Sequence, residues 1–122
     1  MAIRCLIVDD SPRFAQVAVE LLQDEGVDVV GVASGAEEAV RLARELRPDL
    51  ALVDIDLGAD NGLDVASRLC SEEHGRLAEA VILISTHGEE QFAELIAASP
   101  AVGFLPKAQL SVDAIQALLA FG

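Results

Sequence analysis

The chain has 122 residues and a formal net charge of −13, with 52% hydrophobic and only 3% aromatic residues. This length suits one domain built around a single core of Ala, Val, Leu and Ile. No uninterrupted apolar run is longer than that at 80–84, which is too short to cross a bilayer, and the acidic balance argues against binding to nucleic acid.

The first half of the chain alternates short apolar runs with segments of helical period. Residues 3–8 predict a strand that ends in Asp9-Asp10, and Ser11-Pro12 provides a helix cap followed by a proline suited to the first helical turn. The helix that follows is expected to stop at Gly26. Residues 27–33 predict a second strand, and the next helix begins after Ser34-Gly35 and ends before Pro48.

The second half repeats the pattern three times. Strands are predicted at 50–53, 80–84 and 102–105, and the polar residues that follow them are Asp54, Ser85 and, after Pro106, Lys107. Helices are predicted at 63–70, 89–98 and 111–121, the last capped by Ser111.

Five strand–helix repeats predict an α/β fold in which helices cover both faces of a five-stranded parallel sheet, a three-layer α/β/α arrangement. The strands are nearly all apolar, as strands buried on both faces must be. Right-handed crossovers bring the carboxyl ends of all five strands to one edge, where such sheets bind ligands.

Five polar groups therefore converge on that edge, namely Asp9, Asp10, Asp54, Ser85 and Lys107. Three clustered carboxylates would repel one another without a cation. Mg²⁺ suits such a site, because it binds through one or two carboxylates, keeps several waters and shares the rest of its shell with a phosphate.

The chemistry that these residue types allow is phosphoryl transfer. Lys107, the only lysine in the sequence, can neutralise a transferred phosphoryl group, Ser85 can donate to a phosphoryl oxygen, and Asp54 is the natural nucleophile. Each residue alone also fits a plain structural interpretation as a loop acid, a strand-end hydroxyl or a solvated charge. The prediction depends on their combination.

The chain resembles the response-regulator receiver family over essentially its whole length. The matching segments keep the order and spacing of the family, and they are Leu6–Pro12, Leu52–Leu57, Asn61-Gly62, Val81–Ser85 and Gly103–Lys107. The resemblance implies a flavodoxin-like (βα)5 fold and one receiver domain over residues 1–122. It also implies a phosphorelay function in which a sensor histidine kinase phosphorylates Asp54.

The resemblance assigns a role to each matching position. Asp10 would bind Mg²⁺ directly with help from Asp9 and Asp54, and Asp56 would offer its backbone carbonyl to the metal. Ser85 and Lys107 would assist catalysis at the phosphoryl group. Ser85 and Phe104 would act as switch residues that change the surface of the last two helices and the last strand. The protein would assist only its own phosphorylation and dephosphorylation, so it is not expected to be an enzyme.

Some positions depart from the family pattern. Gly58 replaces a typical proline, which predicts a more mobile loop, Thr86 replaces a small residue, and Ala108 replaces a frequent proline that would allow a cis peptide. Asp56 and His87 occupy positions that tune dephosphorylation in the family, so we hypothesise that they set the lifetime of the phosphoryl group. Two exposed polar loop residues are an equally reasonable interpretation.

Two rival functions stay open at this point. Asp54-Ile55-Asp56 resembles the nucleophile motif of haloacid-dehalogenase-type phosphatases, although it follows the third strand and no substrate cap is evident. The other rival is a receiver that acts as a binding module without ever being phosphorylated.

Partners and location follow from the receiver interpretation. Transcription regulation, through either a single-domain regulator or a longer protein carrying an output domain, is compatible with the sequence. A homodimer through the face of the last helix is a further expectation. The absence of a signal-like segment and the two unpaired cysteines, Cys5 and Cys70, predict a cytoplasmic protein without membrane or nucleic-acid contacts of its own.

Overall fold

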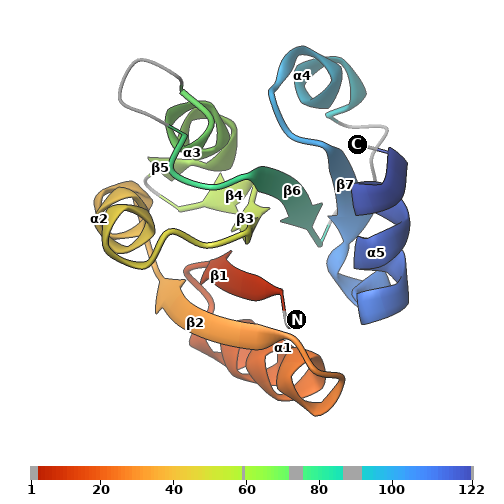
Figure 1. Ribbon diagram of the computed structural model, residues 1–122. Helices are drawn as coiled ribbons and strands as arrows, with labels where there is room; N and C mark the ends of the chain where they lie inside the picture. Colours follow the sequence, from red (N-terminus) through yellow and green to blue (C-terminus); the bar gives the residue numbers. More distant parts are fainter. Residues whose placement is uncertain (1–2, 59, 72–75, 87–91, 122) are drawn as a thin grey trace.

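The five predicted strands form one parallel sheet in the computed structural model, which describes residues 3–58, 60–71, 76–86 and 92–121. In spatial order the strands are β2 (Asp28–Ala33), β1 (Arg4–Val8), β3 (Leu50–Asp54), β6 (Ala80–Ser85) and β7 (Gly103–Pro106). Every neighbouring pair is parallel, so the predicted α/β fold is confirmed (Figure 1).

The helices form a layer on each face of this sheet. Their bounds are α1 (Pro12–Asp24), α2 (Ala36–Leu46), α3 (Gly62–Leu69), α4 (Ala93–Ala98) and α5 (Val112–Phe121). Buried residues of α1 and α5 pack with one face of the strands, whereas those of α2, α3 and α4 pack with the other. Figure 1 shows the three layers with the sheet in the middle.

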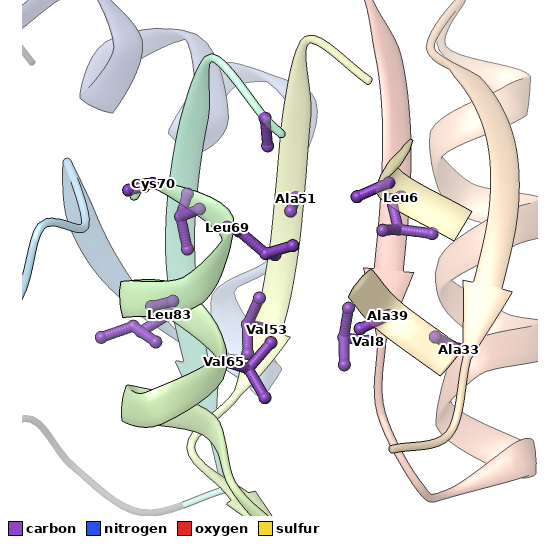
Figure 2. Close-up of a cluster of buried hydrophobic side chains, with 14 of the residues drawn as sticks. Leu6, Val8, Ala33, Ala39, Ala51, Val53, Val65, Leu69, Cys70 and Leu83 are labelled. Atoms are coloured by element: carbon purple, nitrogen blue, oxygen red, sulfur yellow. The ribbon is translucent and has the colours of Figure 1, made fainter. Parts of the chain in front are cut away.

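The strands alternate their side chains between two hydrophobic clusters. In β1, Leu6 and Val8 join the cluster under α2 and α3, whereas Cys5 and Ile7 join the cluster under α1 and α5. Small residues such as Ala39 on α2 keep the helices close to the sheet (Figure 2). Because both faces are buried, the strands have a fixed register, which places their carboxyl ends at a common edge.

The helix starts follow the predicted caps in two cases. The Oγ atoms of Ser11 and Ser111 accept hydrogen bonds from the N–H groups of Phe14 (3.3 Å) and Ala114 (3.0 Å), respectively. At the start of α2, Gly35 offers no side chain for this purpose, and the cap comes instead from a distant residue, as described below.

Three short features were not predicted or differ from expectation. The loop after β3 contains an antiparallel pair of two-residue strands, β4 (Asp56–Leu57) and β5 (Asp60–Asn61), and a 3₁₀ turn, η2 (Lys107–Gln109), precedes α5. Helix α4 begins at Ala93 with Phe92 as its N-cap residue, and residues 89–91 of the helix predicted at 89–98 lie outside the described residues. Within the described ranges, no helix has the length and apolarity needed to span a lipid bilayer.

Candidate functional site at the carboxyl edge of the sheet

The candidate site lies where the order of the strands reverses. Strand β1 lies between β2 and β3: the chain passes from β1 to β2 on one side and then crosses from β2 to β3 on the other. The carboxyl ends of β1 and β3 lie side by side because Val8 pairs with Val53. Open α/β sheets bind their ligands at such a point. Asp9 follows β1 and Asp54 ends β3, so both carboxylates lie at this edge of the sheet.

Asp9 is held by contacts with both of its carboxylate oxygens. Its Oδ1 accepts a hydrogen bond from the N–H of Ser11 at 2.8 Å, and its Oδ2 lies 2.7 Å from Nζ of Lys107. The backbone N–H of Asp9 donates to the carbonyl of Ala33 at the end of β2. With 2% exposure, Asp9 is a buried charge that depends on these partners.

Asp54 is also engaged through both oxygens. Its Oδ1 accepts from the N–H of Asp56 at 3.1 Å, and its Oδ2 lies 3.0 Å from Nζ of Lys107. Burial raises the pKa of the Asp54 carboxyl, and the hydrogen bonds from Lys107 and Asp56 offset only part of this effect. Burial of this carboxylate is therefore only partly compensated by its protein partners.

Lys107 bridges the two buried carboxylates from the end of β7. Burial of its side chain, which is 11% exposed, opposes the charge on the ammonium group. The hydrogen bonds and charges of Asp9 and Asp54 outweigh burial, so the pKa of Lys107 is raised and the group stays protonated. The arrangement places one positive charge among negative groups.

The donor set fits a hard divalent cation. Carboxylate oxygens of Asp9, Asp10 and Asp54 all lie within 4.8 Å of one another, and Asp10 is exposed. One lysine leaves this trio with excess negative charge, which a cation with oxygen ligands would compensate. The residues therefore suit the magnesium site predicted from the sequence.

The other predicted residues surround this centre. Ser85 is buried and follows Ile84, which pairs with Asp54 across β3 and β6. Phe104 is buried in the cluster beneath α2, α3 and α4, so its ring already lies inward. Asp56 is exposed and contacts Asp54 through its backbone N–H, whereas His87 lies outside the described residues.

The departure at Gly58 has a local cause. Gly58 has a φ of 70°, in the left-handed region that proline cannot enter, and it begins the turn between β4 and β5. A Cβ at this position would lie 3.0 Å from Oδ2 of Asp10. Glycine therefore fits both the turn and the close approach to Asp10, and the mobility predicted for this loop is not tested.

Three residues near the site had no predicted role in it. Phe14 on α1 places its ring under the ammonium group of Lys107, with 4.4 Å between Nζ and the ring centroid. Asp60 caps α2, and Gly62 packs against the backbone of Asp54. The position of Phe14 one turn after Asp10 was the available signal, because the first turn of that helix lies near the same edge.

Comparisons with known proteins agree with this geometry. The family model described as "response regulator receiver domain" matches residues 5–119. The positive alginate biosynthesis regulatory protein of Pseudomonas aeruginosa is 40% identical over 115 residues, which cover 93% of this chain and 44% of that protein.

Solved structures show the same fold. The two-component response regulator of the LuxR family from Aurantimonas sp. SI85-9A1 is 28% identical with a TM-score of 0.83, covering 98% of this chain and 86% of that one. A response regulator protein from Burkholderia pseudomallei, solved with a phosphorylated aspartic acid, a calcium ion and citrate, is 26% identical with a TM-score of 0.80, covering 96% and 66%.

The match covers nearly the whole of this chain but only part of its curated relatives. The chain spans about half the length, or less, of the first curated relatives that it matches. The shared part is the βα repeat that carries the site, and the match begins in β1 and ends in α5. This chain therefore belongs to the response regulator receiver domain family of two-component systems.

Proposed function

We propose that this chain accepts a phosphoryl group on Asp54 and thereby switches its surface, as one receiver domain over residues 1–122. The observation that carries the proposal is the bridge from Lys107 to Asp54 and Asp9, at 3.0 Å and 2.7 Å. A carboxylate nucleophile and a charge-neutralising ammonium group are thereby held together at the edge where such sheets bind ligands. The phosphorylated aspartate of the Burkholderia pseudomallei protein supports the same chemistry.

The proposed donor is the phosphohistidine of a sensor histidine kinase. An oxygen of the Asp54 carboxylate forms a bond to phosphorus while the bond between phosphorus and the histidine nitrogen breaks. The bonding electrons return to the imidazole, which takes up a proton. Lys107 then moves its hydrogen bond from the carboxylate of Asp54 to a phosphoryl oxygen, and the transfer depends on alignment and charge neutralisation.

Asp9, Asp10 and Asp54, with the backbone carbonyl of Asp56, would hold the Mg²⁺ ion. When bound, Mg²⁺ supplies positive charge that offsets the negative phosphoryl oxygens. Asp10 is exposed and belongs to the carboxylate trio, so it is accessible to a hydrated ion.

The switch is proposed to run through Ser85 and Phe104. Ser85 is buried at the end of β6, next to the phosphoacceptor strand, and its hydroxyl can donate to a phosphoryl oxygen. Movement of Ser85 alters the packing between β6 and β7, where Leu83 pairs with Phe104. The surface formed by α4, β7 and α5 then repacks.

The proposal extends to partners and cellular context. The chain would be phosphorylated by a sensor histidine kinase, and it would control transcription through an output domain or a partner. A Mycobacterium tuberculosis relative, 31% identical over 115 residues and named a transcriptional regulatory protein, supports this role. We also propose that the chain forms a homodimer through the exposed face of α5. The two free buried cysteines suit the reducing cytoplasm, and the acidic charge disfavours direct contact with nucleic acid.

We propose that the chain assists only its own phosphorylation and dephosphorylation and does not catalyse turnover of a separate substrate. The resemblance of Asp54-Ile55-Asp56 to a haloacid-dehalogenase motif has a different context here, because Asp54 ends the third strand of a receiver fold. Asp56 and His87 are proposed to set the lifetime of the phosphoryl group. Timing dephosphorylation of the variant with both residues replaced tests this role, and an unchanged rate would refute it.

The central test is the intact mass after incubation with acetyl phosphate and Mg²⁺. We expect one added phosphate on the parent and none on Asp54→Asn or on samples treated with a chelator. Asp64→Asn is the matched control, because Asp64 is an exposed acid on α3 outside the carboxylate trio, and it should be phosphorylated normally. Phosphate on Asp54→Asn would refute Asp54 as the acceptor.

A binding module that is never phosphorylated is distinguished by a phosphate mimic. If the switch exists, beryllofluoride with Mg²⁺ should shift the backbone amide NMR signals of residues in β6, β7 and α5. An unchanged spectrum, together with no incorporation from acetyl phosphate or a kinase, would favour the binding module. Molecular mass with and without beryllofluoride tests the dimer, which a monomer under both conditions would contradict.

A further inference from the structure

We propose that Phe14 is a positioning residue for Lys107 during phosphoryl transfer, an inference that rests on the proposed function. The ring centroid of Phe14 lies 4.4 Å from Nζ of Lys107. An ammonium group within about 6 Å of an aromatic face is attracted by the negative potential above the ring.

The ammonium group of Lys107 has partners on three sides. Asp9 lies 2.7 Å away, Asp54 lies 3.0 Å away, and the face of Phe14 lies on a further side. An ammonium group carries three N–H donors, and two carboxylates leave one donor for the ring. Because the lysine side chain is only 11% exposed, the ring replaces solvent that the ammonium group would otherwise need.

The turn that carries Phe14 is tied to Asp9. The N–H of Phe14 donates to Oγ of Ser11, and the N–H of Ser11 donates to Oδ1 of Asp9. The ring and one of the two carboxylates that hold Lys107 are thus fixed by the same first turn of α1. Phe14 itself packs partly buried against the cluster beneath α1 and α5.

The ring offers a kind of contact that suits a moving ammonium group. When Asp54 takes up a phosphoryl group, Nζ must exchange a carboxylate oxygen for a phosphoryl oxygen. A hydrogen-bond acceptor in the place of Phe14 would compete for the same proton, whereas attraction to a π face tolerates small shifts of the charge. Lysine has a flexible four-carbon stem, so a fixed neighbour also limits its conformational freedom.

The contact predicts a dependence on the aromatic character of residue 14. Leucine keeps much of the apolar bulk but has no π face, whereas tyrosine keeps the ring. With acetyl phosphate and Mg²⁺, Phe14→Leu should lower kcat/KM for self-phosphorylation about threefold, equivalent to about 0.7 kcal/mol. Phe14→Tyr should stay close to the parent.

Two controls separate this role from simple packing. Val19→Ala weakens packing of α1 against the same cluster away from Lys107, and its rate should equal that of the parent. In a Lys107→Met background, Phe14→Leu should have no further effect on the rate, because its partner is gone. If that background reacts too slowly to measure, urea unfolding of the parent, Phe14→Leu, Lys107→Met and the double variant measures the coupling between the two side chains. We expect this coupling to change the unfolding constant about threefold.

The outcomes are distinct. An unchanged rate in Phe14→Leu, an equal loss in Phe14→Tyr, or the same loss without Lys107 would each overturn the inference while the proposed function stands. A parent that incorporates no phosphate from acetyl phosphate or a kinase would remove the proposed function and this inference with it. A threefold loss confined to Phe14→Leu with Lys107 present would support both.

Discussion

Oδ2 of Asp60 accepts a hydrogen bond from the backbone N–H of Ala36 at 2.9 Å, so the loop after β3 caps the second helix. The two residues are 24 positions apart in the sequence. The preceding Gly35 permits the contact, because a Cβ there would lie 2.9 Å from the same oxygen. A hydrogen bond therefore connects helix α2 to the loop that carries Asp56.

Asp60→Ala should lower the free energy of unfolding by about 1 kcal/mol, because the N–H of Ala36 loses its capping acceptor. Urea unfolding measures the change. Asp60→Asn should retain most of the stability, since asparagine also caps helices well. Asp64→Ala, an exposed acid without a capping contact, should change stability by less than about 0.5 kcal/mol; an equal loss in Asp64→Ala would argue for general charge effects.

Gly62→Ala should destabilise the protein by about 3 kcal/mol, because the new Cβ would overlap the carbonyl group of Asp54. Gly26→Ala is the matched control. Gly26 has a φ of 93° but no atom within 4 Å of a Cβ, so only backbone strain of about 1 kcal/mol is expected. If urea unfolding gave the same loss of unfolding free energy for Gly62→Ala and Gly26→Ala, close packing at Gly62 would be unimportant.

Asp54→Asn should raise the free energy of unfolding of the metal-free protein at neutral pH. Burial raises the pKa of Asp54 above its usual value of 3.8, so the native state binds the proton more tightly than the unfolded state does. The stability contributed by that proton is complete below pH 3.8 and is lost as pH rises through the raised pKa. The advantage of the variant, followed by urea unfolding in a chelator, should shrink as pH falls; an advantage that grew in acid would contradict the sign.

Mg²⁺ should stabilise the parent, since the proposed site for the ion is the native carboxylate trio, which the unfolded chain does not assemble. At a free concentration about one hundred times the Kd, the gain should approach about 2.7 kcal/mol. Asp10→Ala should abolish the gain while leaving the buried bridge of Lys107 intact. A gain of equal size in Asp10→Ala would place the ion elsewhere.

The sequence predicted most of the fold because its strands carry strong local signals. Strands Leu50–Asp54 and Ala80–Ser85 are mostly apolar and, apart from Ala80, buried, and each ends in the polar residue assigned to the site. The common edge formed by the carboxyl ends of the strands then predicted that Lys107 would lie near Asp9 and Asp54, which the structure confirms.

The remainder depended on contacts between distant segments. The β4–β5 pair has two residues in each strand, too few to show a period, and its turn depends on the positive φ of Gly58. The meeting of Phe14 with Lys107 joins residues from opposite ends of the chain. Side-chain positions of this kind follow from tertiary packing, so no local sequence pattern predicts them.

The bridge of Lys107 has a practical consequence, because no other side-chain primary amine occurs in the sequence. Reagents that acylate amines need an unprotonated, accessible nitrogen, and this one is protonated, nearly enclosed and paired with two carboxylates. Acylation of residue 107 therefore reports how often the site opens. The chain therefore carries a single reactive side-chain amine at the centre of its proposed switch, and peptide mass can follow its acylation.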